Sequence, residues 1–417
     1  MGEVNWAGNV TYAAQSVHSP ASIEELCELI ASTPRIRVLG SRHSFSTIAD
    51  SPTLVSLRAL PAGLSVDRSA GTVSCSPALT YGELSQLLLP EGMALANLGS
   101  LPHISIGGSI ATATHGSGDR NGNLATAVAG LELVTSSGEL IAARRGDGDF
   151  DGLVVGLGAL GAVTRVTLDV EPAYEVKQRI YEGLGWDALD ANFDQLTTLG
   201  YSVSVFTRWD QQAGQLWVKR RVDEGHDALP DELFGARAAV RQVHPIAGGD
   251  PAACTPQLGL PGPWHDRLAH FRLEFTPSAG EELQSEYLLP RAESRPAIEA
   301  LRRLSPRIRP LLHIGEIRTV AADRLWMSPQ CARETVAIHF TWRRRQAAVE
   351  ALLVEVEAAL APFSPRPHWG KLFLADADAL APRYERWSDF VALVARMDSR
   401  GAFRNAWFER KVLGSVA

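Results

Sequence analysis

The sequence predicts an α+β protein built from two domains, and three observations support this class. The chain has 417 residues, which is long for one domain because a domain usually holds about 100–200 residues. The first 170 residues are rich in short strands, small residues and turns, whereas aromatic, charged and proline residues become more frequent after Pro172. The first part opens with a strand–helix–strand order and continues with hairpins, which favours α+β over a doubly wound sheet.

In the first part, helical spacing and capping residues predict two helices. One covers residues 22–32 with Ser22 as its N-cap, and the other covers 80–89, where Thr80 and Glu83 fit a capping box. Alternation between turn residues predicts strands at 35–39, 71–76, 131–135, 139–143 and 163–170, the third and fourth joined as a hairpin.

After Pro172 the pattern again mixes strands with helices. Residues 332–342 are expected to form a strand and 346–360 a helix, and a last helix is expected over 382–397. These elements indicate a second α+β unit.

Charge, apolar runs and cysteine spacing exclude several classes of protein. With 40 Lys and Arg against 47 Asp and Glu, the formal charge is −7, which gives no attraction to nucleic acid or to an anionic membrane. No apolar run approaches the roughly 18 residues of a membrane span, and no secretory leader is apparent, so a cytoplasmic protein is expected. The four cysteines form no CxxC pair, so neither a metal site nor a disulfide framework is predicted.

Residues 156–161 (GLGALG) match the GxGxxG dinucleotide fingerprint but lack its context. That fingerprint requires a helix directly after the glycines, and here an alternating strand pattern follows instead. We therefore expect a plain turn with close backbone packing.

Two other segments carry the main functional signal. Val38 to Phe45 (VLGSRHSF) is a strand that runs into a turn, with His43 at the tip. Residues 100–118 combine glycines, hydroxyl side chains and two histidines with almost no charge. Such backbone can approach a ligand closely, and its N–H groups and hydroxyls can bind a diphosphate. Either segment alone fits a pair of tight turns around a buried histidine better than a binding site.

Together the two segments resemble the flavin-binding domain of the vanillyl-alcohol oxidase family. Residues 5–9 (NWAGN), 368–371 (HWGK) and 398–405 (DSRGAFRN) are similar to its sugar-alcohol and aldonolactone oxidase branch. The resemblance implies FAD, covalently bound through the imidazole of His43 to the flavin 8α carbon. By the same resemblance the residues expected to contact FAD are Gly40, Ser41, Arg42, His43, Ser44, Ser100, Ser105, Gly108, Thr112, His115 and Val163.

The family also implies domain limits. An FAD-binding domain is expected over 1–175, a substrate domain over 176–365, and a C-terminal segment over 366–417 that returns to the FAD domain and carries Lys371 toward the flavin. Arg42 departs from the family, which usually has glycine before the histidine, and this puts the geometry of the turn in question.

In the second part, two alternating segments carry polar side chains. Residues i and i+2 of a strand share a face, so Glu316 and Arg318 should point into the same compartment as His339 and Thr341. Without the resemblance, the first pair fits a surface salt bridge better than a binding site. His339 alone fits a core histidine equally well, and Lys371 alone is better explained as a surface lysine. The resemblance implies that these four residues, Ser100 and Lys371 bind a polyol, and that Glu316, Arg318, His339 and Lys371 are catalytic.

The expected reaction oxidises the terminal primary alcohol of a polyol such as xylitol or sorbitol to the aldose, with O₂ reduced to H₂O₂ by a monomeric enzyme. Arg318 and Lys371 can stabilise the developing alkoxide, and either Glu316 or His339 can accept the hydroxyl proton, directly or through water. Two alternatives remain: an aldonolactone oxidase or dehydrogenase of the same family, and a non-catalytic carbohydrate-binding protein that retains the fold.

Gly99, beside Ser100, has two interpretations. Its missing side chain leaves a gap through which O₂ could reach the flavin, or a turn there requires positive φ.

Overall fold

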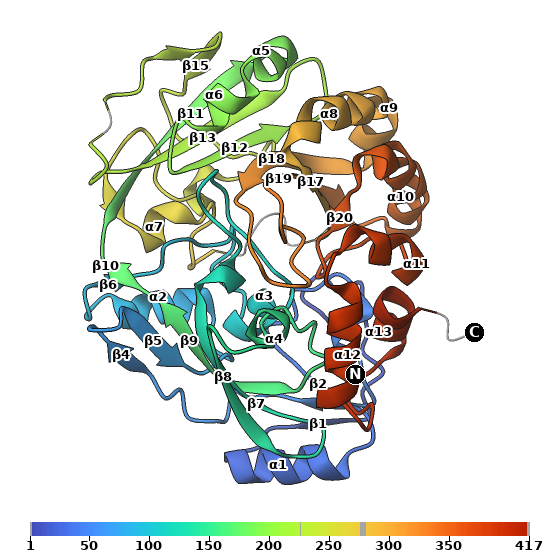
Figure 1. Cartoon of the computed structure of the whole chain (residues 1–417). Coiled ribbons are helices and arrows are strands. Elements are labelled where there is room, and N and C mark those ends of the chain that lie inside the picture. Colours follow the sequence, from blue (N-terminus) through green and yellow to red (C-terminus); the bar gives the residue numbers. More distant parts are fainter. Residues whose placement is uncertain (1, 226, 276–280, 415–417) are drawn as a thin grey trace.

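The structure, a computed structural model, describes residues 2–225, 227–275 and 281–414. Within these ranges the strands form a three-stranded, a five-stranded and a ten-stranded sheet, and one two-stranded pair. The two smaller sheets come from residues before 170 and lie in the lower half of Figure 1, whereas the large sheet fills the upper half. Antiparallel pairing dominates, as expected for an α+β protein.

The smaller sheets contain the N-terminal strands. The three-stranded sheet is parallel, with the order β1–β3–β2. The five-stranded sheet is antiparallel, with the order β4–β5–β9–β7–β8. Their strands are β1 (Ser16–His18), β2 (Ile36–Val38), β3 (Thr53–Val55), β4 (Ser65–Asp67), β5 (Thr72–Cys75), β7 (Val128–Val134), β8 (Leu140–Arg144) and β9 (Ala162–Asp169). All five strands expected here are present, with ends shifted by one to three residues.

Both helices expected in the N-terminal part form with the predicted caps. In α1 (Ile23–Ser32), the Ser22 side chain accepts a hydrogen bond from the Glu25 amide. In α2 (Tyr81–Leu88), Thr80 and Glu83 form the reciprocal bonds of a capping box.

The large sheet has the order β14–β15–β11–β13–β12–β18–β19–β17–β20, and β16 also pairs with β11. Its strands are β11 (Glu175–Leu184), β12 (Ser202–Thr207), β13 (Gly214–Arg221), β14 (Glu232–Leu233), β15 (Ala236–Ala238), β16 (Gly262–Pro263), β17 (Glu282–Pro290), β18 (Leu312–Val320), β19 (Thr335–Arg343) and β20 (Arg366–Pro367). The expected strand 332–342 begins three residues late, because Ala332 has the left-handed φ of 59° and belongs to a turn.

A long helix lies on one face of this sheet. The Tyr287 hydroxyl on β17 donates to Glu357 on α10 (Gln346–Leu360), so α10 lies on the side opposite the polar residues of β17. Shorter elements include β6 (Met93–Ala94), which pairs with β10 (Glu171–Pro172), and the helices α3 (Ile106–Ala111), α4 (Phe150–Leu153), α5 (Trp186–Ala191), α6 (Phe193–Thr197), α7 (His265–Leu268), α8 (Ser294–Arg303), α9 (Ser305–Ile308) and α11 (Ala377–Leu380).

The C-terminal helices α12 (Trp387–Met397) and α13 (Ala406–Phe408) lie beside the N-terminal sheets (Figure 1). The Ile36 amide on β2 donates to the Ala402 carbonyl across 2.8 Å. The expected helix over 382–397 starts later, at Trp387, because the chain becomes extended at Tyr384 after a short 3₁₀ turn.

The GxGxxG segment is a turn, as predicted. Leu157, Gly158 and Gly161 have positive φ, and β9 follows directly. Within the described ranges, no helix is long and apolar enough to cross a membrane, and no three His, Cys, Asp or Glu side chains are grouped to hold a metal ion.

Candidate active site

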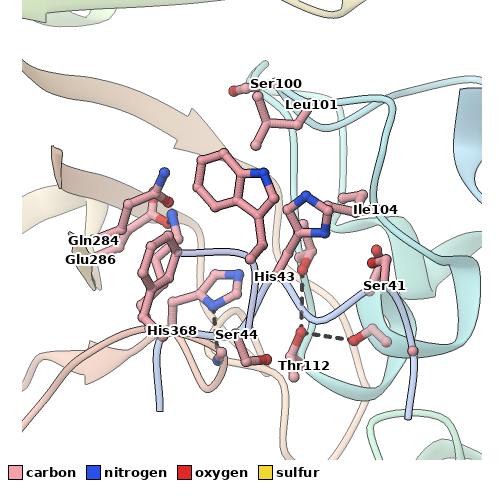
Figure 2. A pocket seen from close by; sticks show the side chains of 18 of the residues that line it. Ser41, His43, Ser44, Ser100, Leu101, Ile104, Thr112, Gln284, Glu286 and His368 are labelled. Atoms are coloured by element: carbon pink, nitrogen blue, oxygen red, sulfur yellow. Dashed lines mark hydrogen bonds and ion pairs between the residues drawn. The ribbon is translucent and has the colours of Figure 1, made fainter. Parts of the chain in front are cut away.

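One cavity between the smaller sheets and the large sheet contains nearly all of the expected site residues (Figure 2). Figure 2 shows Gln284 and Glu286 on one side of it, Ser41 and Thr112 on the other, and His43 between them. The expected residues that line it are Gly40, Ser41, Arg42, His43, Ser44, Ser100, Ser105, Gly108, Thr112, His115, Glu316, Arg318, His339, Thr341 and Lys371. Val163 is not among the lining residues; it lies on β9, opposite Leu133 of β7.

The N-terminal segment holds the loop that carries His43. Asn5 Nδ2 donates to the Ser44 carbonyl across 2.9 Å, and the indole of Trp6 stacks on the His43 ring with 5.3 Å between centroids. Asn9 Nδ2 donates to the Phe45 carbonyl across 3.0 Å. The opening NWAGN motif is therefore part of the wall behind His43.

Arg42 adopts the conformation that glycine favours. Its φ is 64°, in the left-handed region, which explains why a glycine suits this position. The arginine is accommodated because its side chain points outward and pairs with Glu3 across 2.9 Å, while its carbonyl accepts from the Trp6 amide. The turn thus forms despite the departure from the family pattern.

The His43 side chain is partly buried, and its two ring nitrogens are shielded from solvent and have no hydrogen-bond partner among the described residues. Burial lowers its pKa to about 4, with a further contribution from His103. The ring is therefore neutral near pH 7, with an unshared electron pair available on one nitrogen.

The two glycine-rich segments meet beside His43. Ser41 Oγ accepts a hydrogen bond from the Ser105 amide at 2.8 Å, and the Ser41 amide donates to Ser105 Oγ at 3.2 Å. A side chain on Gly40 would place its Cβ 2.6 Å from Ser105 Oγ, so this approach requires glycine. His43, without a hydrogen-bond partner among the described residues, and this close-packed backbone fit the FAD that the sequence motifs imply, which Gly40, Ser41, Ser105 and Gly108 would hold.

At the other end of the cavity, three neighbouring strands contribute a row of polar residues. On β19, His339 lies opposite Glu316 of β18 and opposite Glu286 of β17. Phe340, between His339 and Thr341, points away and stacks on Trp342 with 4.7 Å between ring centroids. Side chains along these strands therefore alternate between the two faces of the sheet, as the sequence predicted.

Glu286 links the two cations of this end. Arg318 Nη2 donates to Glu286 Oε1 across 2.9 Å, and Lys371 Nζ donates to Glu286 Oε2 across 2.6 Å. Burial by itself raises the pKa of the Glu286 carboxyl, but Lys371 and Arg318 outweigh it and hold this pKa well below its usual value. Glu286 is therefore an anion.

Glu316 and His339 have equally specific partners. Glu316 Oε1 accepts from His270 Nε2 at 3.1 Å; burial raises the Glu316 pKa, but Arg318 and His270 together lower it below its usual value. His339 lies 2.8 Å from Lys371 Nζ through Nδ1 and 3.0 Å from Thr341 Oγ1 through Nε2. Burial, followed by Lys371, lowers the His339 pKa to about 4, so this ring is neutral.

Several cavity residues were missed by the sequence analysis. Gln284 and Glu286 alternate on β17, and this period-two spacing could have identified them. His270 follows α7 outside any strand, and no periodic signal marks it. Arg37 is buried on β2 and also lines the cavity. It donates hydrogen bonds to the Leu157 and Ile48 carbonyls.

Gly99 does not adopt a left-handed backbone, so the explanation that a turn requires positive φ there is wrong. An added Cβ would make ordinary contacts, the nearest 3.5 Å away at Ile104 Cδ1.

Two family models match this chain, and a solved structure shares its fold. A family model described as FAD binding domain covers residues 14–144, and one described as D-arabinono-1,4-lactone oxidase covers 280–411. Among solved structures, cholesterol oxidase from B. sterolicum shares the fold, with a TM-score of 0.79, 15% identity, and coverage of 98% of this chain and 96% of that one.

Fold, cavity and the matched domain define an FAD-dependent oxidoreductase. An alditol oxidase from Streptomyces sp. (strain IKD472 / FERM P-14339) is 47% identical over 97% of each chain. An L-gulono-1,4-lactone dehydrogenase from Mycobacterium tuberculosis (strain ATCC 25618 / H37Rv) is 28% identical over 98% of each. The chain belongs to the vanillyl-alcohol oxidase family of flavoproteins, with alditol oxidase among its relatives.

Proposed function

We propose that the protein oxidises the terminal primary alcohol of polyols such as xylitol or sorbitol to the aldose, with O₂ reduced to H₂O₂. The observation that carries this proposal is the cavity, in which the His43 loop and a group of hydrogen-bonding side chains line one space. Ser100, Gln284 and Thr341 supply neutral groups for hydroxyls, and the alditol oxidase relative supports the same substrate class.

The charged residues account for activation of the alcohol. An alcohol is a weak acid, so loss of its proton requires positive charge near the developing alkoxide. Arg318 and Lys371 supply that charge in a buried site, where it is screened less than in water. When bound, FAD supplies an acceptor for the two electrons that leave the carbinol carbon, and O₂ can then remove them.

The hydroxyl proton has two candidate acceptors in the cavity, Glu316 and His339. The Glu316 carboxylate is a weak base because Arg318 and His270 stabilise its charge. It also serves to orient the substrate, since its position is fixed by His270.

We further propose that FAD is attached covalently through His43. The ring is neutral and has no competing hydrogen bond, which suits bonding of a ring nitrogen to the 8α carbon of FAD once that methyl group has lost a proton. The imidazole would lose its own proton, and O₂ would remove the two electrons that the bond leaves on the flavin. We retain the domain limits 1–175, 176–365 and 366–417 as part of this proposal. The Ile36–Ala402 hydrogen bond supports the return of the last segment to the FAD domain.

An aldonolactone oxidase is the second candidate, because the lactone oxidase family model matches residues 280–411. This range includes the polar residues of β17, β18 and β19 that line the cavity, and also Lys371. A peroxide-coupled assay across polyols, sugars and sugar lactones distinguishes the two. Faster turnover of lactones than of polyols would overturn the main proposal. A protein that purifies without visible flavin absorbance would instead support the carbohydrate-binding alternative.

A further inference from the structure

We infer that Glu286 is a positioning residue, which keeps Lys371 protonated and thereby fixes the proton of His339 on Nε2. This inference rests on the proposed alcohol oxidation. Glu286 was not expected from the sequence as a site residue. Its role follows from three contacts that connect β17, β19 and the 368–371 segment.

The first contact is the ion pair with Lys371. Glu286 Oε2 lies 2.6 Å from Lys371 Nζ, and the carboxylate is fully buried. Arg318, a buried cation, occupies the other oxygen at 2.9 Å. Without this carboxylate, Arg318 and the largely buried Lys371 would face each other, with Glu316 as the remaining nearby anion.

The second contact sets the direction of a hydrogen bond. A lysine ammonium has three donors and no acceptor, so His339 Nδ1, 2.8 Å from Lys371 Nζ, must accept. A neutral imidazole carries its single proton on the other nitrogen, which is Nε2.

The third contact uses that proton. His339 Nε2 lies 3.0 Å from Thr341 Oγ1, so Nε2 donates and the hydroxyl accepts. Both nitrogens of His339 are then engaged, and His339 acts as a donor that orients Thr341 instead of as a base. Of the two candidate proton acceptors, this leaves Glu316.

The charged and titratable groups around Lys371 determine the pH at which it loses its proton. Glu286 faces it from β17, Arg318 and Glu316 from β18, His339 from β19, and His368 from its own segment. Burial lowers the Lys371 pKa, Glu286 opposes this, and Arg318 lowers it further. Loss of the Glu286 charge should therefore let Lys371 lose its proton at a lower pH.

The test compares flavin-loaded wild type with Glu286→Gln, which removes the charge, and Glu286→Asp, which keeps it. In Glu286→Gln we expect kcat to fall about 10-fold or more. The alkaline limb of the pH profile of kcat should move to lower pH by about 1–3 units. Glu286→Asp should keep the alkaline limb near that of wild type. Asp323→Asn, which changes a partly buried carboxyl outside the cavity lining, is the control and should leave the alkaline limb in place.

A second measurement does not depend on turnover. In the NMR spectrum of protein labelled with ¹⁵N-histidine, the His339 signal can be assigned by its loss in His339→Gln. This signal should show a proton on Nε2 and an unprotonated Nδ1. A proton on Nδ1 in wild type would overturn the inference, and so would a Glu286→Gln variant with wild-type kcat and limb. If Glu286→Gln does not fold, the wild-type tautomer decides. Wild type that oxidises neither alcohols nor lactones would refute the proposed function, whereas the tautomer result would still judge the role of Glu286.

Discussion

The Phe45 amide donates a hydrogen bond to the Gly370 carbonyl across 2.8 Å, and so joins two segments that lie far apart in the sequence. Phe45 ends the loop that carries His43, and Gly370 directly precedes Lys371. The residue proposed to hold the flavin and a cation proposed to activate the substrate are therefore fixed to each other through the backbone. Displacement of either loop should disturb both ends of the cavity.

His43→Ala should abolish covalent attachment of FAD, because the substitution removes the imidazole at the tip of the loop. Acid-precipitated wild type should stay yellow, and a peptide containing His43 should carry the mass of the flavin. The variant should hold at most dissociable FAD. Complete release of flavin from wild type by acid would refute covalency, although not FAD binding.

Lys371→Ala and Arg318→Ala should each lower kcat by about 10²-fold or more, with a smaller change in KM, since both cations matter most for the developing alkoxide. Arg343→Ala is the control, because Arg343 is an exposed cation at the end of β19 and does not line the cavity. Steady-state kinetics of flavin-loaded variants measure this. Wild-type kcat in both variants would place the chemistry elsewhere.

Arg42→Gly should be more stable than Arg42→Ala, by about 1 kcal/mol, because the left-handed φ of 64° strains alanine but not glycine. Both variants lose the exposed ion pair with Glu3, so their difference isolates the backbone. Urea unfolding of the two proteins gives the difference. Equal stability would mean that the turn relaxes to another conformation.

Acid should destabilise the fold between about pH 6.5 and pH 4. Burial depresses the pKa of His270 and of His339 to about 4 in the folded state, from 6.5 for an exposed histidine. In that window the unfolded chain binds protons that the folded chain does not, so the free energy of unfolding falls as pH falls. Unfolding measured against pH should show a slope smaller by about one proton in His270→Gln. An unchanged slope would show that His270 is already protonated in the folded protein.

Gly99→Val should slow reoxidation of the reduced enzyme by O₂ while reduction by substrate stays close to wild type. Gly99→Ala should fold and bind FAD normally, because the space around Gly99 admits a Cβ. Stopped-flow measurement of each half-reaction separates the two effects. If a well-folded, flavin-loaded Gly99→Val is reoxidised at the wild-type rate, Gly99 does not lie on the path of O₂.

The sequence by itself determined the features that depend on neighbouring residues. The caps of α1 and α2 formed as expected, because a capping side chain bonds to an amide only three positions away. Glu316, Arg318, His339 and Thr341 lie on one side of their strands because side-chain direction alternates in any strand. The ends of the 332–342 strand and the 382–397 helix were less predictable, since a turn at Ala332 and an extended Tyr384 set them.

Only the tertiary structure decided which residues meet. Glu286 joins the site because β17 pairs with β19 in a register that places it opposite His339, and register depends on packing of the whole sheet. His270 reaches Glu316 from a loop whose path no local pattern specifies. The charge state of these groups follows from burial and from partners distant in the sequence. Long-range contacts therefore decided which residues meet in the site and their charge states. Short-range preferences decided the helix caps and the faces of the strands on which the site residues lie.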